Sequence, residues 1–180
     1  ISYSDSTTII DRGGDHKTLA KFYTELDGKL QEFIAKQKIF FVGTAAPEGR
    51  VNVSPKGLDS LRVLNAKQLI WLNLTGSGNE TAAHVLEQAR MTLMFCSFEG
   101  KSRILRVYGK ARAIHAREEE WAEWSALFPE YPGTRQIFLL DDDSAQTAGG
   151  FAVPNYQYQE DRGELIDWTK KISDEGVKNY

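Results

Sequence analysis

The residues most suited to chemistry form a loop of small side chains, residues 75–79 (TGSGN), between an apolar segment and a segment with helical periodicity. Glycines let backbone N–H groups approach an anion closely, and a helix start adds free donors and a positive dipole end. Ser77, Asn79 and Thr81 add side-chain donors. The pattern predicts an anion site. The alternative is an ordinary strand-to-helix turn with Asn79 as N-cap, and no Walker or dinucleotide-binding motif decides between them.

A second set of polar residues lies on a predicted strand, residues 50–56 (RVNVSPK). Strand periodicity places Val51 and Val53 on one face, and Asn52, Ser54 and Lys56 on the other. Exposure to solvent is the default interpretation of the polar face, because polar side chains are mostly exposed. The alternative is that this face lines a binding site. Arg106, on the predicted strand 104–114, poses the same question.

Other reactive residue types give weaker signals. His16, His84 and His115 are too scattered in the sequence to predict a metal site. The acidic run 141–143 (DDD) lacks the spaced ligands of a calcium loop, so a solvated turn is expected. Cys96 lies in an apolar segment without a neighbouring cation, which predicts a buried, inert thiol. We therefore expect neither a metal centre nor a nucleophilic triad.

The elements that must position these residues are short strands and a few helices. Asp27 is the predicted N-cap of a first helix carrying Leu30, Phe33 and Ile34. Connections between the early strands are too short for parallel crossovers, which favours an antiparallel sheet. The expected strands are 39–45, 50–56, 61–64, 69–74, 91–98, 104–114 and 137–140, and the later helices begin near 80, 118 and 162. We predict an α+β fold, a small antiparallel barrel with flanking helices.

Length and composition bound the remaining possibilities. The 180 residues fit one domain, which we place at 21–180, after a polar N-terminal arm at 1–20. Basic residues number 22 and acidic residues 25, and this balance argues against non-specific nucleic-acid binding. One cysteine cannot form an intrachain disulfide, which fits a reducing compartment. No apolar run approaches the ~20 residues of a membrane span. We expect a cytoplasmic protein with neither nucleic acid nor membrane as partner.

Several segments also carry a family likeness. They are residues 40–45 (FFVGTA), 52–57 (NVSPKG), 71–81 (WLNLTGSGNET), 91–98, 103–111 and the later 146–154 (QTAGGFAVP). Their order and character resemble the pyridoxamine 5′-phosphate oxidase-like family of flavin-binding split barrels. The resemblance covers most of the chain after residue 20. It implies a split β-barrel that binds flavin mononucleotide (FMN) and works as a homodimer, with the cofactor at the subunit interface.

The resemblance also assigns positions to the cofactor. Lys56 falls on the family's basic strand position, and Gln146 and Thr147 resemble its polar pair near the isoalloxazine. Either Arg50 or Lys56 would offset the phosphate charge, while Asn52, Ser54, Arg106 and Gln146 would hydrogen-bond the ring or ribityl oxygens. Residues 79–81 (NET) stand where the oxidases carry a Ser-Arg-Lys phosphate clamp, so Glu80 replaces a cation with an anion. The oxidases' C-terminal basic residues have no clear counterpart, and pyridoxamine phosphate is not the expected substrate.

Three functional hypotheses follow from these residues. The first is a flavin-dependent oxidoreductase acting on an unknown small molecule. The second is a module that binds flavin, deazaflavin or haem without turnover. The third is a cofactor-free dimeric barrel.

Overall fold

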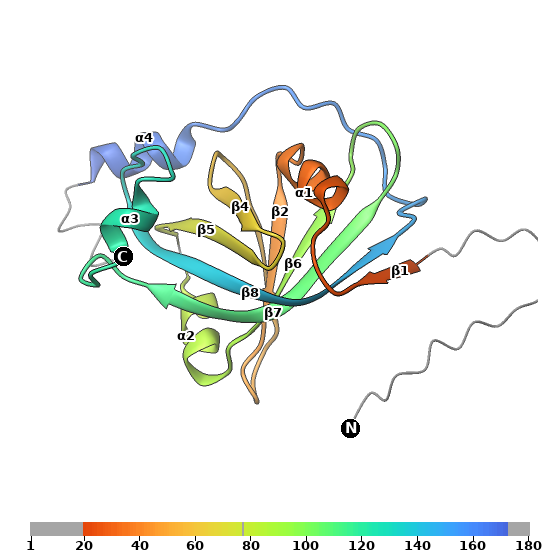
Figure 1. The fold of residues 1–180 in the computed structure, drawn as a ribbon. Coiled ribbons are helices and arrows are strands. Elements are labelled where there is room, and N and C mark those ends of the chain that lie inside the picture. Colours follow the sequence, from red (N-terminus) through yellow and green to blue (C-terminus); the bar gives the residue numbers. More distant parts are fainter. Residues whose placement is uncertain (1–19, 77, 173–180) are drawn as a thin grey trace, which may run out of the picture.

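A computed structural model describes residues 20–76 and 78–172 of the chain (Figure 1). Its strands and helices alternate irregularly along the sequence, as expected for an α+β fold. The strands are β1 (Ala20–Tyr23), β2 (Phe40–Thr44), β3 (Asn52–Lys56), β4 (Leu61–Asn65), β5 (Gln68–Leu74), β6 (Arg90–Cys96), β7 (Ile104–Ile114) and β8 (Thr134–Ala148). The helices are α1 (Gly28–Ala35), α2 (Glu80–Glu87), α3 (Trp121–Ser125) and α4 (Glu164–Lys171).

All strands belong to one antiparallel sheet in the order β3-β2-β6-β7-β8-β5-β4, with β1 paired to β8. The long, curved β7 and β8 carry the sheet across the molecule (Figure 1). Helices α1 and α2 lie at opposite ends of the barrel in this view, and both pack against the same inner core cluster. The sheet curls until β3 and β5, which do not pair, are joined by a side-chain hydrogen bond from Lys56 to Asn73. The predicted α+β antiparallel split barrel is confirmed.

Two apolar clusters occupy the two faces of β5 and β8. Alternation sends Trp71 and Phe138 into the barrel, where their rings stack at 4.7 Å, and sends Ile70 and Ile137 to the opposite face. The second cluster is covered by Trp121 and Trp124 of α3, which are half-buried. The helix predicted to begin near residue 118 is thus present, but α3 begins at Trp121 and is short.

The prediction of a solvated turn at residues 141–143 is wrong. These residues continue β8, which runs far beyond the expected strand 137–140, and Asp142 is only 6% exposed. A bulge opposite Tyr108 and Gly109 shifts the register here. A Cβ on Gly109 would stand 2.0 Å from the Asp141 carbonyl oxygen, so the close approach of the two backbones requires glycine. This part of the strand was not predicted because three acidic residues in a row are typical of turns.

Some predictions fall on parts of the chain outside the described residues. These are the N-terminal arm up to residue 19, Ser77, and the end of the predicted final helix beyond residue 172. Within the described residues, no helix is long and apolar enough to cross a membrane. Cys96 is buried, and burial raises the pKa of its thiol, as expected for an inert cysteine.

Candidate functional site

The polar face of β3 points into the barrel. Asn52, Ser54 and Lys56 are half-buried and pair across the strands with the buried Thr44, Val42 and Phe40 respectively, so they share the inner face with them. The opposite face is the exposed one, with Val51 71% and Val53 62% exposed. The default expectation that the polar face meets solvent is therefore wrong. It lines the inside of the barrel opening.

Lys56 is the cation at the centre of this face. Its Nζ donates to Oδ1 of the buried Asn73 at 3.3 Å and lies 5.3 Å from the centroid of the Trp71 ring. Burial lowers the pKa of Lys56, and the positive charge of Arg135 lowers it further. The negative charge of Glu80 acts in the opposite direction. Lys56 is thus a half-buried cation that feels the charge of both a second cation and an anion.

The start of α2 is tied to the same face. Asn52 donates through Nδ2 to Oγ1 of the buried Thr81 at 3.1 Å, and Ser54 Oγ donates to Asn52 Oδ1 at 3.1 Å. Asn79 holds the N-cap position, but its side chain makes no capping bond to the helix. Instead its Oδ1 accepts from Nε2 of Gln136, a residue 1% exposed on β8, at 2.8 Å. Asn79 therefore anchors the loop to the sheet, which the turn-only interpretation did not foresee.

Arg135 is the cation that sequence reasoning missed. It lies on β8, next to Gln136, and its guanidinium donates to the carbonyl oxygens of Gly78 at 3.2 Å and Gly76 at 3.5 Å. The residue could not be placed from the sequence because β8 was expected to begin only at residue 137. Pairing of Gln136 with Asn73 on β5 brings this end of β8 to the loop.

The remaining predicted residues lie elsewhere. Arg50 is exposed in the turn before β3. Arg106 and Gln146 pair with each other on the outer face of the sheet, opposite to Lys56, and Tyr108 Oη donates to Gln146 Oε1 at 3.1 Å. Thr147 pairs with Leu105 on the inner-face register, and its Oγ1 donates to the Lys21 carbonyl oxygen of β1 at 3.5 Å. One subunit therefore does not bring Arg106 and Gln146 to Lys56.

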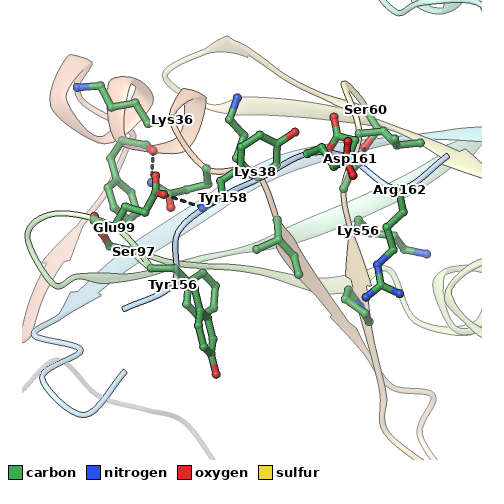
Figure 2. A pocket seen from close by; sticks show the side chains of 18 of the residues that line it. Lys36, Lys38, Lys56, Ser60, Ser97, Glu99, Tyr156, Tyr158, Asp161 and Arg162 are labelled. Atoms are coloured by element: carbon green, nitrogen blue, oxygen red, sulfur yellow. Dashed lines mark hydrogen bonds between the residues drawn. The ribbon is translucent and has the colours of Figure 1, made fainter. Parts of the chain in front are cut away.

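A large cavity, about 1750 Å³, opens beside Lys56. Its walls come from α1, the end of β3, the end of β5, the 97–103 loop and the segment leading to α4. Figure 2 shows Lys56 and Arg162 at one end, Lys36 and Glu99 at the other, and Tyr158 and Lys38 between them. The backbone amides of Tyr156 and Tyr158 donate to Phe98 O and Glu99 Oε1, which fixes the covering segment over the cavity.

Other reactive side chains do not form a competing centre. His84 Nδ1 is hydrogen-bonded to the buried Thr44 Oγ1 at 3.1 Å, which is a structural contact. Among the residues that the structure describes, no group of three His, Cys, Asp or Glu side chains is placed to hold a metal ion.

The polar cluster at the barrel opening, which we call the Lys56 site, comprises Asn52, Ser54, Lys56, Asn73, Asn79, Thr81, Arg135 and Gln136.

Comparison with known proteins agrees with this fold. The family model described as pyridoxamine 5′-phosphate oxidase matches residues 26–148. A curated relative, the pyridoxamine 5′-phosphate oxidase family protein ustO of Aspergillus flavus, is 36% identical over 138 residues, which is 74% of this chain. The chain spans about half the length of that relative, 55%.

Two solved structures share the fold at low sequence identity. One is a Clostridium acetobutylicum protein related to general stress protein 26, of the pyridoxinephosphate oxidase family (TM-score 0.53, 15% identity, 76% of this chain and 94% of that one). The other is HutZ, described as the heme storage protein from Vibrio cholerae (TM-score 0.50, 19% identity, 70% of this chain and 96% of that one). By its fold and by the extent of the family match, this chain belongs to the pyridoxamine 5′-phosphate oxidase family.

Proposed function

We propose that this protein is an FMN-dependent oxidoreductase that holds the flavin phosphate at the Lys56 site. The observation that carries the proposal is the convergence of Lys56, Arg135 and the start of α2 at one end of the barrel. Two cations beside a helix start are suited to a phosphate, which needs positive charge and several hydrogen-bond donors. Family membership supports the same cofactor.

The side chains of the Lys56 site match what a phosphate group needs. A phosphate offers only acceptor oxygens, and the Lys56 site offers a lysine ammonium, a guanidinium and the amide and hydroxyl groups of Asn79 and Thr81. Asn73 and Gln136, both buried on the inner face, supply further polar groups at the opening. This donor set fits a phosphate. Glu80 is the one opposed group.

When bound, the flavin would supply the redox chemistry, and the protein would position it and exclude water. The cavity beside Lys56 is large enough for a small-molecule substrate, since ligand pockets are commonly about 300–1,000 Å³. Phe98 and Tyr156, whose ring centroids lie 5.6 Å apart, give it an aromatic wall. Pyridoxamine phosphate is not the proposed substrate.

We propose further that the protein is a homodimer that completes the site. The outer sheet face exposes Val51 and Val53, and Phe22 is 69% exposed. Arg106 and Gln146 lie on this outer face, where they cannot reach Lys56 of their own subunit. In a dimer built on this face, they would be placed to reach the cofactor of the other subunit.

A second candidate is a module that binds haem or flavin without turnover. Two observations support this second candidate. Glu80 replaces a cation of the family's phosphate clamp, and the chain shares its fold with HutZ. The test is anaerobic mixing of the FMN-loaded protein with a nicotinamide donor. Bleaching of the flavin absorbance near 450 nm, faster than for free FMN, supports the oxidoreductase. Spectra with haem instead of FMN, showing a saturable Soret shift and no flavin binding, would favour the second candidate.

A further inference from the structure

Glu80 is the first residue of α2, and its carboxylate folds back over the loop that precedes the helix. A Cβ built on Gly78 would stand 2.2 and 2.6 Å from the two carboxylate oxygens. The carboxylate therefore lies directly against the Gly78 backbone, at the end of α2 where an anion is most favoured. Glycine at position 78 is what leaves room for it.

The surrounding charges place this carboxylate within the Lys56 site. Its negative charge acts on Lys56, and Arg135 holds the carbonyl oxygens of Gly76 and Gly78 from the other side. Lys56 and Arg135 contribute two positive charges, and Glu80 removes one. A ligand phosphate would meet a net charge of about +1 instead of +2.

We propose that Glu80 is an internal anion that competes with a ligand phosphate at the Lys56 site and so sets the charge specificity of the site. This inference rests on the proposed function, which it deepens. A phosphate monoester carries a charge of about −1.5 to −2 at neutral pH, so it is repelled by a fixed carboxylate more strongly than a singly charged group is. Glu80 is exposed, so solvent screens its charge in part; it should weaken phosphate binding and not abolish it.

The specificity that follows is a reduced preference for phosphorylated flavin over riboflavin. Solvent screens the repulsion between two charges near a protein surface, so the effect of one exposed carboxylate is modest. We therefore expect the isosteric substitution Glu80→Gln to tighten FMN binding about tenfold, with riboflavin affinity unchanged. Glu87→Gln, at the last residue of the same helix, is the matched control and should change neither affinity.

Titration of the parent and both variants with FMN and with riboflavin, followed by flavin fluorescence, tests this directly. A selective gain for FMN in Glu80→Gln supports the proposal. If the parent binds FMN and Glu80→Gln binds it no better, the proposal is wrong while the proposed function stands.

Inorganic phosphate is a probe that does not depend on flavin. Its titration can be followed by the amide NMR shifts of Gly76, Gly78 and Thr81 in the parent and in Glu80→Gln. Tighter phosphate binding in Glu80→Gln, with no flavin bound by either protein, would support the role of Glu80 and refute the proposed cofactor. Equal phosphate affinities would overturn the proposal.

Discussion

Lys56 on β3 donates a hydrogen bond to Asn73 on β5 across 3.3 Å, although four strands separate β3 from β5 in the sheet. The bond therefore crosses the split of the barrel. It also holds the ammonium above the Trp71 ring, in a place where burial lowers the pKa of Lys56. Lys56 therefore links the two strands where the barrel closes, and at the same place it offers a half-buried positive charge to an anionic ligand.

Replacing Lys56 should weaken binding of the phosphorylated cofactor specifically. Lys56→Met removes the charge but keeps an apolar stem over Trp71. A hydrogen bond to a charged group is worth roughly 1.5–3 kcal/mol, so FMN affinity should fall about ten- to a hundredfold. Riboflavin, which lacks the phosphate, should bind both proteins about equally. Lys38→Met, elsewhere on the cavity wall, is the control and should leave FMN affinity unchanged. If Lys56→Met also leaves FMN affinity unchanged, the phosphate does not bind at β3.

Arg135 should matter for the shape of the loop as well as for its charge. Arg135→Lys keeps the charge, but an ammonium cannot reproduce the planar fork that spans the carbonyl oxygens of Gly76 and Gly78. We expect faster amide hydrogen exchange at residues 76–79 and roughly tenfold weaker FMN binding. Arg117→Lys serves as a control outside the site. Unchanged exchange in Arg135→Lys would show that the loop is held by the Gln136–Asn79 bond alone.

The sequence was sufficient for the fold and for five of the eight residues of the Lys56 site; Asn73, Arg135 and Gln136 were not foreseen. Alternation in β3 placed Asn52, Ser54 and Lys56 on one face, and the small-residue loop pointed to Asn79 and Thr81. Arg135 and Gln136 were missed because their strand extends beyond its apolar run, and strand ends are set by pairing partners far along the chain. Arg106 and Gln146 were grouped with Lys56 although they lie on the other face. Their position depends on sheet register, which no local pattern reveals.

We expect the exposed Val51 and Val53, just before and within β3, to lie in the dimer interface. Val53→Asp places a charge on the outer face, where no core contact is lost because Val53 is 62% exposed. We expect a shift from dimer to monomer in sedimentation at micromolar concentration, with the fold retained by circular dichroism. Leu86→Asp, at an 83% exposed position on α2, should leave the dimer intact. A parent protein that sediments as a monomer would refute the proposed assembly.

Asp142 should make the protein less stable at neutral pH than in mild acid. Its side chain is buried, and burial raises the pKa of Asp142 from 3.8 to about 6, although the positive charge of Lys67 and a backbone contact with Ser144 act in the opposite direction. A carboxyl pKa higher in the folded state means that the folded protein binds the proton more tightly. The destabilisation therefore develops as the pH rises from about 4 and is complete above about 6.

Asp142→Asn should relieve this cost, by about 3 kcal/mol at most above pH 6. Urea unfolding at pH 7.5 should show a more stable variant, and near pH 4.5 the gain should shrink to roughly a third of its value at pH 7.5. Asp141→Asn, at the exposed neighbouring position, should be neutral at both pH values. A gain of equal size at both pH values would mean that titration of Asp142 is not its cause.

The central claim, that this barrel holds a flavin through its phosphate, is tested most directly by one titration. The purified full chain, freed of any bound cofactor, is added to FMN and to riboflavin at the same concentrations while flavin fluorescence is followed. We expect saturable quenching by FMN, with an affinity that falls in Lys56→Met toward that of riboflavin. Absence of quenching or of any spectral shift with both flavins would contradict it and leave a barrel that works without this cofactor.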